Sequence, residues 1–276
     1  MNEVVVVTGA ASGIGRAIAL RLAPSSSLII VDLDAEHLAE TEKSIWELGG
    51  TVKSLVGDIA ERSTHRLAIQ EADSLGVLTG WVNCAGIGGM TPLHLMPEDP
   101  TIMSRIFEIN QVGTFWGCAE AVRHFIAHKT NGSIVNISSV HSRRAYKDHA
   151  IYEMTKAAID ALTRNIAVVY GPYGIRANSV APGAIMTEAM KQSFIDAPDP
   201  IARENDLRRG TPLKRIGEPS EIAEVVEFLI SARSSYLSGQ SICVDGGWTA
   251  ALGVGDLDNE LAQSFHLDQK TGLESG

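Results

Sequence analysis

The chain has 276 residues, of which 45% are apolar, and its net charge is −10 at pH 7. These values suit one large α/β domain, or two small ones, with a sizeable core, and they exclude a disordered chain. An acidic surface disfavours general binding to nucleic acid or to an anionic membrane. No run reaches the roughly 18 apolar residues of a membrane span. We therefore expect no nucleic-acid or membrane partner.

The N-terminal sequence and the cysteines both favour a cytoplasmic protein. MNEVVVVTGA enters a strand-like run at once, without the basic start and small-residue cleavage site of a secretion signal. Cys84, Cys118 and Cys243 are odd in number, far apart and not at metal-ligand spacing. We expect three free thiols in a reducing compartment, and no metal site.

Short β-branched runs alternate with longer segments of helical period. The strand-like runs lie at 3–8, 27–32, 51–56, 80–85, 133–138, 175–181 and 241–245. The helical segments lie at 14–22, 35–48, 63–75, 102–128, 151–170 and 220–231. Nearly continuous apolar strands separated by helices predict a doubly wound α/β fold, with a parallel sheet of about seven strands and helices on both faces (a Rossmann fold). Ligands of such folds bind at the carboxyl ends of the strands.

No repeat, low-complexity stretch or linker interrupts this alternation, so we expect a single domain over 1–248. The segment 187–219 departs from the pattern and contains Pro198, Pro200 and Pro212 before its final residue, Pro219. It predicts an insertion with short helices, of the kind that covers a site as a lid. The residues 249–276 hold five acids and one lysine with little periodicity, which indicates a C-terminal extension.

The first strand is followed by the glycine-rich sequence TGAASGIG at 8–15. Gly9, Gly13 and Gly15 permit a sharp turn and a close approach by a ligand, and the next helix directs free N–H groups towards it. A diphosphate fits this arrangement. The second strand ends in Asp32, which can accept hydrogen bonds from both ribose hydroxyls and repels a 2′-phosphate. Because Ser12, not a basic residue, stands in the loop, we expect NAD in preference to NADP.

Further motifs follow in order along the chain. They are Asp58–Ile59, NCAG at 83–86, Asn110, Ser138–Ser139, Tyr152-x-x-x-Lys156, PGAIMT at 182–187 and SGQSICVDGG at 238–247. With the glycine loop, this series resembles the short-chain dehydrogenase/reductase family in its shorter branch of roughly 250 residues. The resemblance runs from Val4 to about Trp248. Ser139 precedes Tyr152 by thirteen residues, the separation usual in that family.

The resemblance implies a catalytic set of Asn110, Ser139, Tyr152 and Lys156. Tyr152 would be the general acid/base, although a free tyrosine has a pKa near 10. Lys156, one helical turn away, would lower that pKa and hold the nicotinamide ribose. Ser139 would hydrogen-bond the substrate oxygen. Asn110 would position a water that links Lys156 to solvent.

The resemblance also implies a set of cofactor-binding residues in the loops that follow the strands. They are Gly9, Ser12, Gly13, Ile14, Gly15, Asp32, Asp58, Ile59, Asn83, Ala85, Gly86, Tyr152, Lys156, Pro182, Gly183, Ile185 and Thr187. Asp58 would meet the adenine, Asn83 and Gly86 would line the groove, and Ile185 and Thr187 would hold the carboxamide. Cys84 stands where the family more often has a second asparagine.

The expected substrate contacts are Ser139, His141, Tyr152 and Met186. The pocket wall would also include Ile87, Gly88, Met90, Val140 and the segment 186–190. Five basic or histidine residues make the segment 141–149 positive within an acidic protein. It either attracts an anionic or polyhydroxylated substrate, or serves a subunit contact or a solvated surface, which is the reading we favour.

These features predict an NAD-dependent oxidoreductase of a secondary alcohol, polyol or sugar, or of the matching ketone. By resemblance it would be a homotetramer through the helices at 102–128 and 151–170 and its last strand. An NADPH-dependent reductase of carrier-bound 3-oxoacyl chains shares the motifs, but Asp32 counts against it. A non-catalytic dinucleotide sensor would have no need of Ser139, Tyr152 and Lys156 together.

Overall fold

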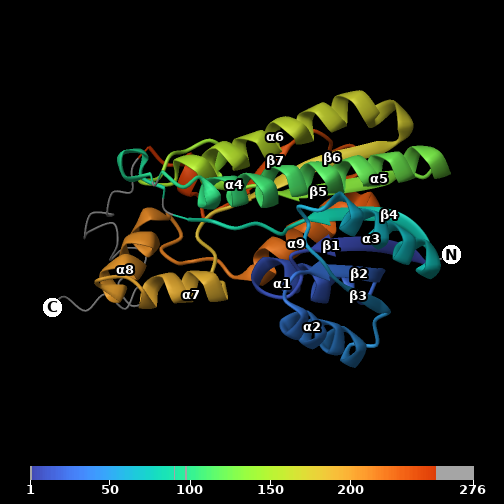
Figure 1. Cartoon of the computed structure of the whole chain (residues 1–276), viewed down its shortest axis with the longest axis horizontal. Helices are drawn as coiled ribbons and strands as arrows, with labels where there is room; N and C mark the ends of the chain where they lie inside the picture. Colours follow the sequence, from blue (N-terminus) through green and yellow to red (C-terminus); the bar gives the residue numbers. More distant parts are fainter. Residues whose placement is uncertain (1, 90, 97, 253–276) are drawn as a thin grey trace, which may run out of the picture.

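The computed structural model describes residues 2–89, 91–96 and 98–252. Seven strands form one parallel sheet in the order β3-β2-β1-β4-β5-β6-β7 (Figure 1). The strands are β1 (Glu3–Thr8), β2 (Ser27–Asp32), β3 (Val52–Val56), β4 (Val77–Asn83), β5 (Gly132–Ile137), β6 (Ile175–Pro182) and β7 (Ser241–Val244). This confirms the predicted seven-stranded doubly wound fold. The order of strands reverses between β1 and β4, which opens a crevice at their carboxyl ends.

Helices cover both faces of the sheet, each over its own apolar core (Figure 1). The α-helices are α1 (Gly13–Leu22), α2 (Ala35–Glu47), α3 (Arg62–Leu75), α4 (Thr101–Phe107), α5 (Thr114–His128), α6 (Ala150–Tyr170), α7 (Glu188–Ile195), α8 (Pro200–Gly210) and α9 (Pro219–Ile230). On one face, α1, α2 and α9 bury residues such as Ile18 and Val226. On the other, α3, α5 and α6 bury residues such as Phe125 and Ile166. The strands are apolar on both sides because both sides are covered.

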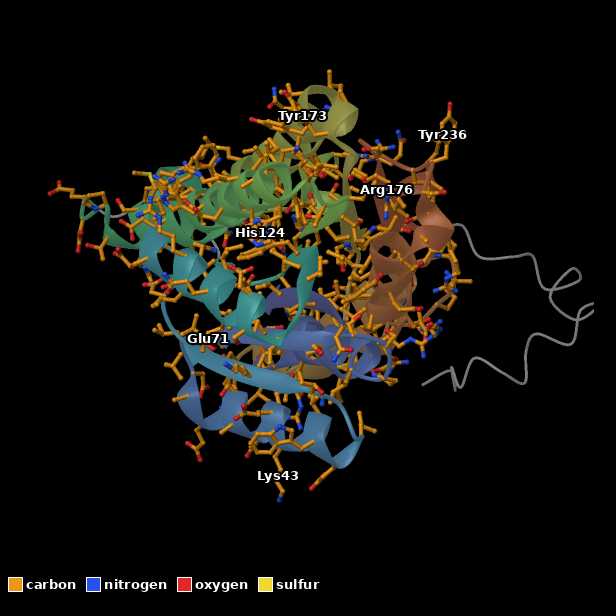
Figure 2. The ribbon with its side chains drawn as sticks, turned by 90° about the vertical axis from the view of Figure 1, so that its right-hand side faces the viewer. Lys43, Glu71, His124, Tyr173, Arg176 and Tyr236 are labelled. Carbon is orange, nitrogen blue, oxygen red and sulfur yellow. The ribbon has the colours of Figure 1, made fainter. Side chains whose placement is uncertain are left out.

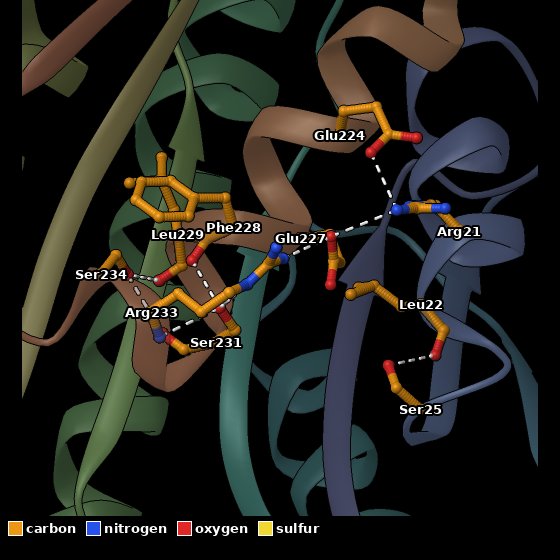
Figure 3. Close-up of polar contacts among 10 residues, drawn as sticks. All are labelled: Arg21, Leu22, Ser25, Glu224, Glu227, Phe228, Leu229, Ser231, Arg233 and Ser234. Carbon is orange, nitrogen blue, oxygen red and sulfur yellow. Dashed lines mark hydrogen bonds and ion pairs between the residues drawn. The ribbon is translucent and has the colours of Figure 1, made fainter.

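Charged side chains join α1 to α9 at the surface (Figure 3). Arg21 Nη2 lies 2.9 Å from a carboxylate oxygen of Glu224 and 3.5 Å from one of Glu227. Arg233, just beyond α9, approaches the same Glu227 oxygen to 2.7 Å. Because these pairs are partly exposed to solvent, each contributes only about 0–1 kcal/mol. The apolar contacts beneath them therefore hold α9 on the sheet.

Arg176 of β6 fastens the turn between α9 and β7. Its guanidinium donates hydrogen bonds to the main-chain oxygens of Leu229, Ser231 and Leu237. Figure 2 shows Arg176 inside this region and Tyr236 projecting from it into solvent. The turn that leads into the edge strand β7 is thus held by a half-buried side chain, and β7 itself by its pairing with β6.

The segment predicted as one helix over 102–128 contains a π-helical turn. Helix α4 ends at Phe107, and the turn η2 (Glu108–Gly113) joins it to α5. Gly113 lets Ile59 pack against the turn, since a Cβ at Gly113 would lie 2.5 Å from Ile59 Cδ1. Periodicity predicted the helical segment, but not the turn that carries Asn110. Such turns occur frequently at functional sites.

The strand predicted at 80–85 lies earlier in the chain, at Val77–Asn83. Val77 pairs with Glu3 at the start of β1, so β4 begins three residues before the apolar run suggested. It ends at Asn83 because Thr8 Oγ1 accepts hydrogen bonds from the next two amides, those of Cys84 and Ala85. The other strands differ from the predicted ranges by a single residue or not at all.

Helices α7 and α8 occupy most of the segment 187–219, at the end of the molecule away from the N-terminus (Figure 1). They enclose a small apolar cluster that includes Phe194, Leu207 and Ile216. The two short helices were predicted, and their role as a lid stays a prediction. Of the extension 249–276, only residues 249–252 lie within the described part of the chain. None of the described helices has the length and apolar character needed to cross a bilayer.

Candidate active site

The crevice between β1 and β4 is closed at its base by main-chain contacts around the glycine loop. A Cβ on Gly15 would lie 1.9 Å from the carbonyl oxygen of Gly9. A Cβ on Gly9, whose φ is +71°, would lie 2.6 Å from the backbone of Ala85. Only glycine fits at either position, so the loop brings bare backbone to the floor of the crevice.

The N-terminus of α1 opens onto the same crevice. Within the described residues, the amides of Gly13, Ile14 and Gly15 have no acceptor in the chain, and the Ser12 hydroxyl caps nothing. Gly13 has φ +52°, and a Cβ there would lie 3.2 Å from Thr187 Cγ2. A narrow cradle of free N–H groups at the positive end of a helix dipole fits a dinucleotide diphosphate.

Asp32 stands at the mouth of the crevice with its carboxylate oriented by two amides. Oδ2 accepts a hydrogen bond from Ala11 N at 3.0 Å, and Oδ1 accepts one from Asp34 N at 3.1 Å. Arg16, in the first turn of the neighbouring helix α1, is directed to Glu40 and Ser44 of α2. A carboxylate without a nearby cation fits a ribose diol better than a 2′-phosphate.

Asp58, predicted to meet the adenine, is bound on both oxygens. Oδ1 accepts from Ala60 N at 2.9 Å, and Oδ2 lies 2.6 Å from Arg105 Nη2. Burial opposes ionisation, but these hydrogen bonds and the Arg105 charge outweigh it and hold the pKa of Asp58 below its ordinary value. Arg105 of α4 is therefore a residue of the site edge that no motif predicted. The Ile59 side chain is buried in the core against Gly113, which leaves its main chain to meet the cofactor, and its role in cofactor binding stays a prediction.

The Asn83 side chain is directed into the core, so the prediction that Asn83 lines the cofactor groove stays a prediction for its main chain. Its Oδ1 accepts from Trp81 Nε1, and its Nδ2 donates to Asn136 Oδ1 at 2.8 Å and to Cys118 Sγ. Asn136 continues this buried network to Thr163 of α6. The Asn83 amide is thus committed to holding β4 and β5 together, because a buried amide must find partners. Ala85 and Gly86, by contrast, do lie at the crevice.

Asn110 joins the loop after β4 to α6. Its Oδ1 accepts from Ile87 N at 2.9 Å, and its Nδ2 donates to Ile87 O at 2.9 Å and to Thr155 Oγ1 at 3.1 Å. The side chain is fully buried. Both amide protons of Asn110 therefore have protein acceptors, and the side chain positions the backbone next to Gly86; that Asn110 positions a water stays a prediction.

Tyr152 and Lys156 lie one turn apart on α6, as predicted. The Lys156 ammonium is 5.4 Å from the centre of the Tyr152 ring and donates a hydrogen bond to Ile137 O at 2.9 Å. Lys156 is 4% exposed, and a Cβ on Gly86 would lie 3.4 Å from its Nζ. An ammonium has three donors, and within the described residues only one finds an acceptor, so two remain for ligand oxygens.

Ser139 begins the 3-10 turn η3 (Val140–Ser142), which follows β5. Its Oγ accepts a hydrogen bond from His141 N at 3.2 Å, so the hydroxyl proton remains free to donate. The His141 ring lies 5.6 Å from the Tyr152 ring in an edge-on arrangement. The structure therefore brings Ser139, Tyr152 and Lys156 to one place.

His141 is the centre of an aromatic and polar cluster. Its Nδ1 lies 3.5 Å from Glu153 Oε1, and its ring lies 5.9 Å from that of Tyr146 and 5.4 Å from that of His149. Burial, helped by the neighbouring His149, lowers the pKa of His141. A neutral imidazole in this position can exchange hydrogen bonds with a substrate hydroxyl.

The two arginines of the basic segment 141–149 bind main-chain oxygens of the same chain. Arg143 Nη2 donates to Ser241 O at 3.0 Å, and Arg144 Nη2 donates to Thr249 O at 3.2 Å. These contacts fasten the segment to β7 and to the turn after it. Attraction of an anionic substrate is therefore not the role that their geometry favours.

The loop after β6 supplies the other wall of the crevice. A Cβ on Gly183, which follows Pro182, would lie 2.8 Å from the backbone of Asp245. Ile185 is buried and pairs with Gly217 in an isolated bridge. Thr187 caps α7 and faces Gly13, whereas Met186 packs on the apolar cluster of α7 and α8. Met90 lies outside the described residues.

Cys84 adds no chemistry to this site, and the cluster of potential metal ligands in the described part of the chain lies elsewhere. Burial raises the pKa of the Cys84 thiol to about 12, so the thiol is neutral and inert. In the described part of the chain, Asp73, His124 and His128 bring potential ligand atoms within 4.8 Å of one another, away from the crevice, on α3 and α5. The two imidazoles stack at 4.0 Å with only 24° between their planes, so their nitrogens do not converge on one point. The prediction of no metal site stays a prediction.

Comparison with known proteins places these features in a family. The family model described as Enoyl-(Acyl carrier protein) reductase matches residues 9–249. The 3beta-hydroxysteroid dehydrogenase 1 of Eggerthella lenta is 33% identical over 251 residues, which cover 90% of this chain and 94% of that protein. The levodione reductase of Leifsonia aquatica is 34% identical over 262 residues, 91% of this chain and 95% of that protein.

Two solved structures show the same fold over nearly the whole chain. The crystal structure of levodione reductase has a TM-score of 0.85 at 32% identity and is matched over 98% of its chain, with 90% of this one. A gluconate 5-dehydrogenase from Burkholderia cenocepacia J2315, in complex with NADP and tartrate, has a TM-score of 0.82 at 33% identity, with 91% and 96% of the two chains covered. The chain belongs to the short-chain dehydrogenase/reductase family, whose members are oxidoreductases that use a nicotinamide dinucleotide.

Proposed function

We propose that this protein is an NAD-dependent dehydrogenase that interconverts a secondary alcohol and its ketone, with Tyr152 as the general acid/base. The observation that carries the proposal is the buried Lys156 ammonium. It lies one turn from Tyr152, has one acceptor within the described residues, and faces Gly86 at the crevice. A cation buried at such cost needs a functional reason, and activation of a neighbouring phenol supplies one.

Each residue of the site has a part in moving one proton. When bound, the nicotinamide accepts or returns the hydride. The Tyr152 oxygen takes the hydroxyl proton of the alcohol, and the Lys156 charge favours the tyrosinate form that this requires. Ser139 donates a hydrogen bond to the substrate oxygen and so holds that oxygen opposite Tyr152. Asn110 holds the Ile87 backbone and Thr155, and thereby keeps the loop after β4 against α6.

The preference for NAD rests on Asp32. Both oxygens are oriented by amides, yet each retains a lone pair for a ribose hydroxyl. No cation approaches this carboxylate among the described residues, so a 2′-phosphate would meet uncompensated repulsion. The free thiols fit the reducing, cytoplasmic compartment in which we place the enzyme.

The substrate class follows from His141. A half-buried neutral imidazole beside Tyr152 offers a second hydrogen-bonding group to a substrate held by Ser139. We therefore favour a polyol, a sugar or another compound with a second hydroxyl near the reacting carbon. This class agrees with the gluconate dehydrogenase among the similar structures.

A turnover screen tests the proposal. Purified protein is assayed with NAD and with NADP against polyols, sugars, hydroxy acids and cyclic alcohols, by the absorbance of the reduced cofactor. We expect NAD-linked turnover that Tyr152→Phe lowers by about 10³-fold while NAD still binds. Near-normal turnover in that variant would remove Tyr152 from the mechanism.

An NADPH-dependent reductase of carrier-bound 3-oxoacyl chains is the second candidate. It is favoured by the bound NADP in similar structures and by the description of the matching family model. A higher kcat/KM with NADPH and a 3-oxoacyl thioester than with NAD and any alcohol would establish it. A dinucleotide sensor remains a third reading, which predicts binding of the cofactor without any turnover.

We also propose that the protein forms a homotetramer through α5 and α6. Both helices present large apolar side chains to solvent, among them Phe115, Met154 and Val168. Apolar residues gathered on two adjacent helices are typical of a protein–protein contact. Light scattering after gel filtration should give about four times the mass of one chain. A monomer would contradict the proposal without affecting the assigned chemistry.

A further inference from the structure

Asp160 is a buried carboxylate that the proposed chemistry does not use. It is 5% exposed and lies on α6, one turn after Lys156 and two turns after Tyr152, so the three side chains share a face of the helix. The nearest cationic group, Arg143 Nε, is 3.9 Å away and belongs to a half-exposed side chain. A weak ion pair of this kind does not offset the cost of burying a carboxylate.

Hydrogen bonds from three serine hydroxyls offset the cost of burying the Asp160 carboxylate. Asp160 Oδ2 accepts from Ser142 Oγ at 2.6 Å and from Ser241 Oγ at 3.2 Å, and Oδ1 accepts from Ser179 Oγ at 2.7 Å. The three donors come from the turn η3, from β7 and from β6. Asp160 is therefore the point at which three separate elements are fastened to the catalytic helix.

The contact with Ser142 bears directly on Ser139. The segment 138–142 is attached to α6 at two places that flank Ser139. Ser138 Oγ donates to the Lys156 carbonyl at 3.2 Å, and Ser142 Oγ donates to Asp160. The turn is tight between these points, since Ser142 N donates to Ser139 O at 3.0 Å. Removing the second attachment would leave one end of the turn free to shift relative to Tyr152.

We propose that Asp160 is a positioning residue for Ser139. By holding Ser142, it sets where the Ser139 hydroxyl stands relative to Tyr152 and Lys156. Ser179 and Ser241 hold the carboxylate in the orientation that this requires. The proposal rests on the function assigned above to Ser139, and it adds a residue that does not itself touch the substrate.

The first test separates positioning from folding. Asp160→Asn keeps the shape of the side chain but weakens its acceptance of hydroxyl protons. We expect kcat to fall about 10–100-fold, the loss typical of a displaced catalytic group, with the KM for NAD unchanged. Glu120→Gln is the matched control, because Glu120 is a buried carboxylate of α5 that is bound to Arg62, away from the crevice. It should lower the melting temperature without lowering kcat, and a similar loss of kcat in both variants would overturn the proposal.

The second test removes the partners of Asp160 one at a time. Ser142→Ala should lower kcat nearly as much as Asp160→Asn, whereas Ser179→Ala and Ser241→Ala should chiefly lower the melting temperature. These substitutions are mild, so they remain informative even where Asp160 variants fold poorly. An unchanged kcat in Ser142→Ala would show that Asp160 does not position Ser139 through its hydrogen bond with Ser142.

A double variant tests the dependence on Ser139. In a Ser139→Ala enzyme, adding Asp160→Asn should lower kcat no further, because the group that Asp160 positions is already gone. A second, independent fall would overturn the proposal. Failure of the assigned function looks different: wild-type protein would show no NAD-linked or NADP-linked turnover at all. Normal turnover in Asp160→Asn beside an impaired Ser139→Ala would refute the role of Asp160 alone.

Discussion

The two halves of the crevice present different kinds of chemical group: main-chain amides in one and side chains in the other. Around β1, α1 and β2, the ligand-facing groups are main-chain amides exposed by glycines, and the one prominent side chain, Asp32, is itself oriented by amides. Around β5, η3 and α6, side chains hold one another: Asn110 bonds Thr155, and Asp160 bonds Ser142. The first half has a backbone shape that fits a diphosphate, and the second half positions side chains through hydrogen-bond networks.

This difference has a physical cause. A diphosphate is bound well by several N–H groups at a helix N-terminus, which require backbone but no particular side chain. Proton transfer requires specific side chains at hydrogen-bond distance, and these must be held by further partners. We therefore expect an added side-chain atom to abolish cofactor binding in the first half. In the second half, we expect the loss of one hydrogen bond to lower the rate of turnover.

The largest effect in the cofactor half should come from one added methyl group. Gly15→Ala would place a Cβ 1.9 Å from the Gly9 carbonyl oxygen, so the loop must move. We expect a loss of stability of about 1–3 kcal/mol and loss of detectable NADH binding, measured by fluorescence titration and thermal unfolding. Gly171→Ala is the control, since no atom lies within 4 Å of its Cβ position. Normal NADH binding by Gly15→Ala would contradict recognition by backbone shape.

The choice of cofactor should depend on the single side chain in that half. If Asp32 binds the ribose as proposed, Asp32→Ala removes two charge-assisted hydrogen bonds, each worth about 1.5–3 kcal/mol. We expect the ratio of kcat/KM for NAD to that for NADP to fall by at least about tenfold. Asp34→Ala removes a neighbouring carboxylate that caps α2, and should leave the ratio unchanged. Equal ratios in wild type and Asp32→Ala would show that another group selects the cofactor.

A smaller effect on stability should appear at acid pH. Burial lowers the pKa of His65, on α3, although its hydrogen bond to Ile59 O opposes this. Because the folded pKa lies below the unfolded value of about 6.5, the unfolded chain binds the proton first. The stability from neutral His65 is therefore present above about pH 6.5 and is lost as the pH falls through the folded pKa. The melting temperature of His65→Gln should depend less on pH in this range than that of wild type, and identical profiles would contradict the assignment.

The smallest effect on activity is expected from a thiol reagent that reacts with cysteines. Burial raises the pKa of Cys84 and of Cys118 to about 12, so both are neutral thiols at pH 8. Iodoacetamide should leave both unmodified in the folded protein, as judged by mass spectrometry, and activity should persist. Labelling of both after unfolding is the control. Rapid labelling of Cys84 in the folded enzyme would show that the crevice floor opens.

Much of the fold and of the site was predictable because its signals are local. Alternating apolar strands and helical segments span a few residues to a few turns each, and they predicted all seven strands with small shifts. The glycine loop and the spacing of Tyr152 and Lys156 are likewise contained within one strand–helix junction or one helical turn. Ser139 was identified through the family resemblance, in which its separation from Tyr152 is the usual one.

Only the tertiary structure decided which hydrogen-bond partner each buried polar side chain finds. Asn83 turned into the core, where it bonds Asn136, and the amide of Asn110 is taken by Ile87 and Thr155. Arg105 reached Asp58 across 47 residues of chain, and Asp160 gathered serines from three elements.

The sequence by itself determined the strands, the glycine-rich turn after β1 and the spacing of Tyr152 and Lys156 on one helix, because near neighbours in the chain set backbone conformation and helical spacing. It did not determine which donor meets which acceptor. Several partners of similar strength compete for each buried polar group, and only the packing of distant elements selects among them.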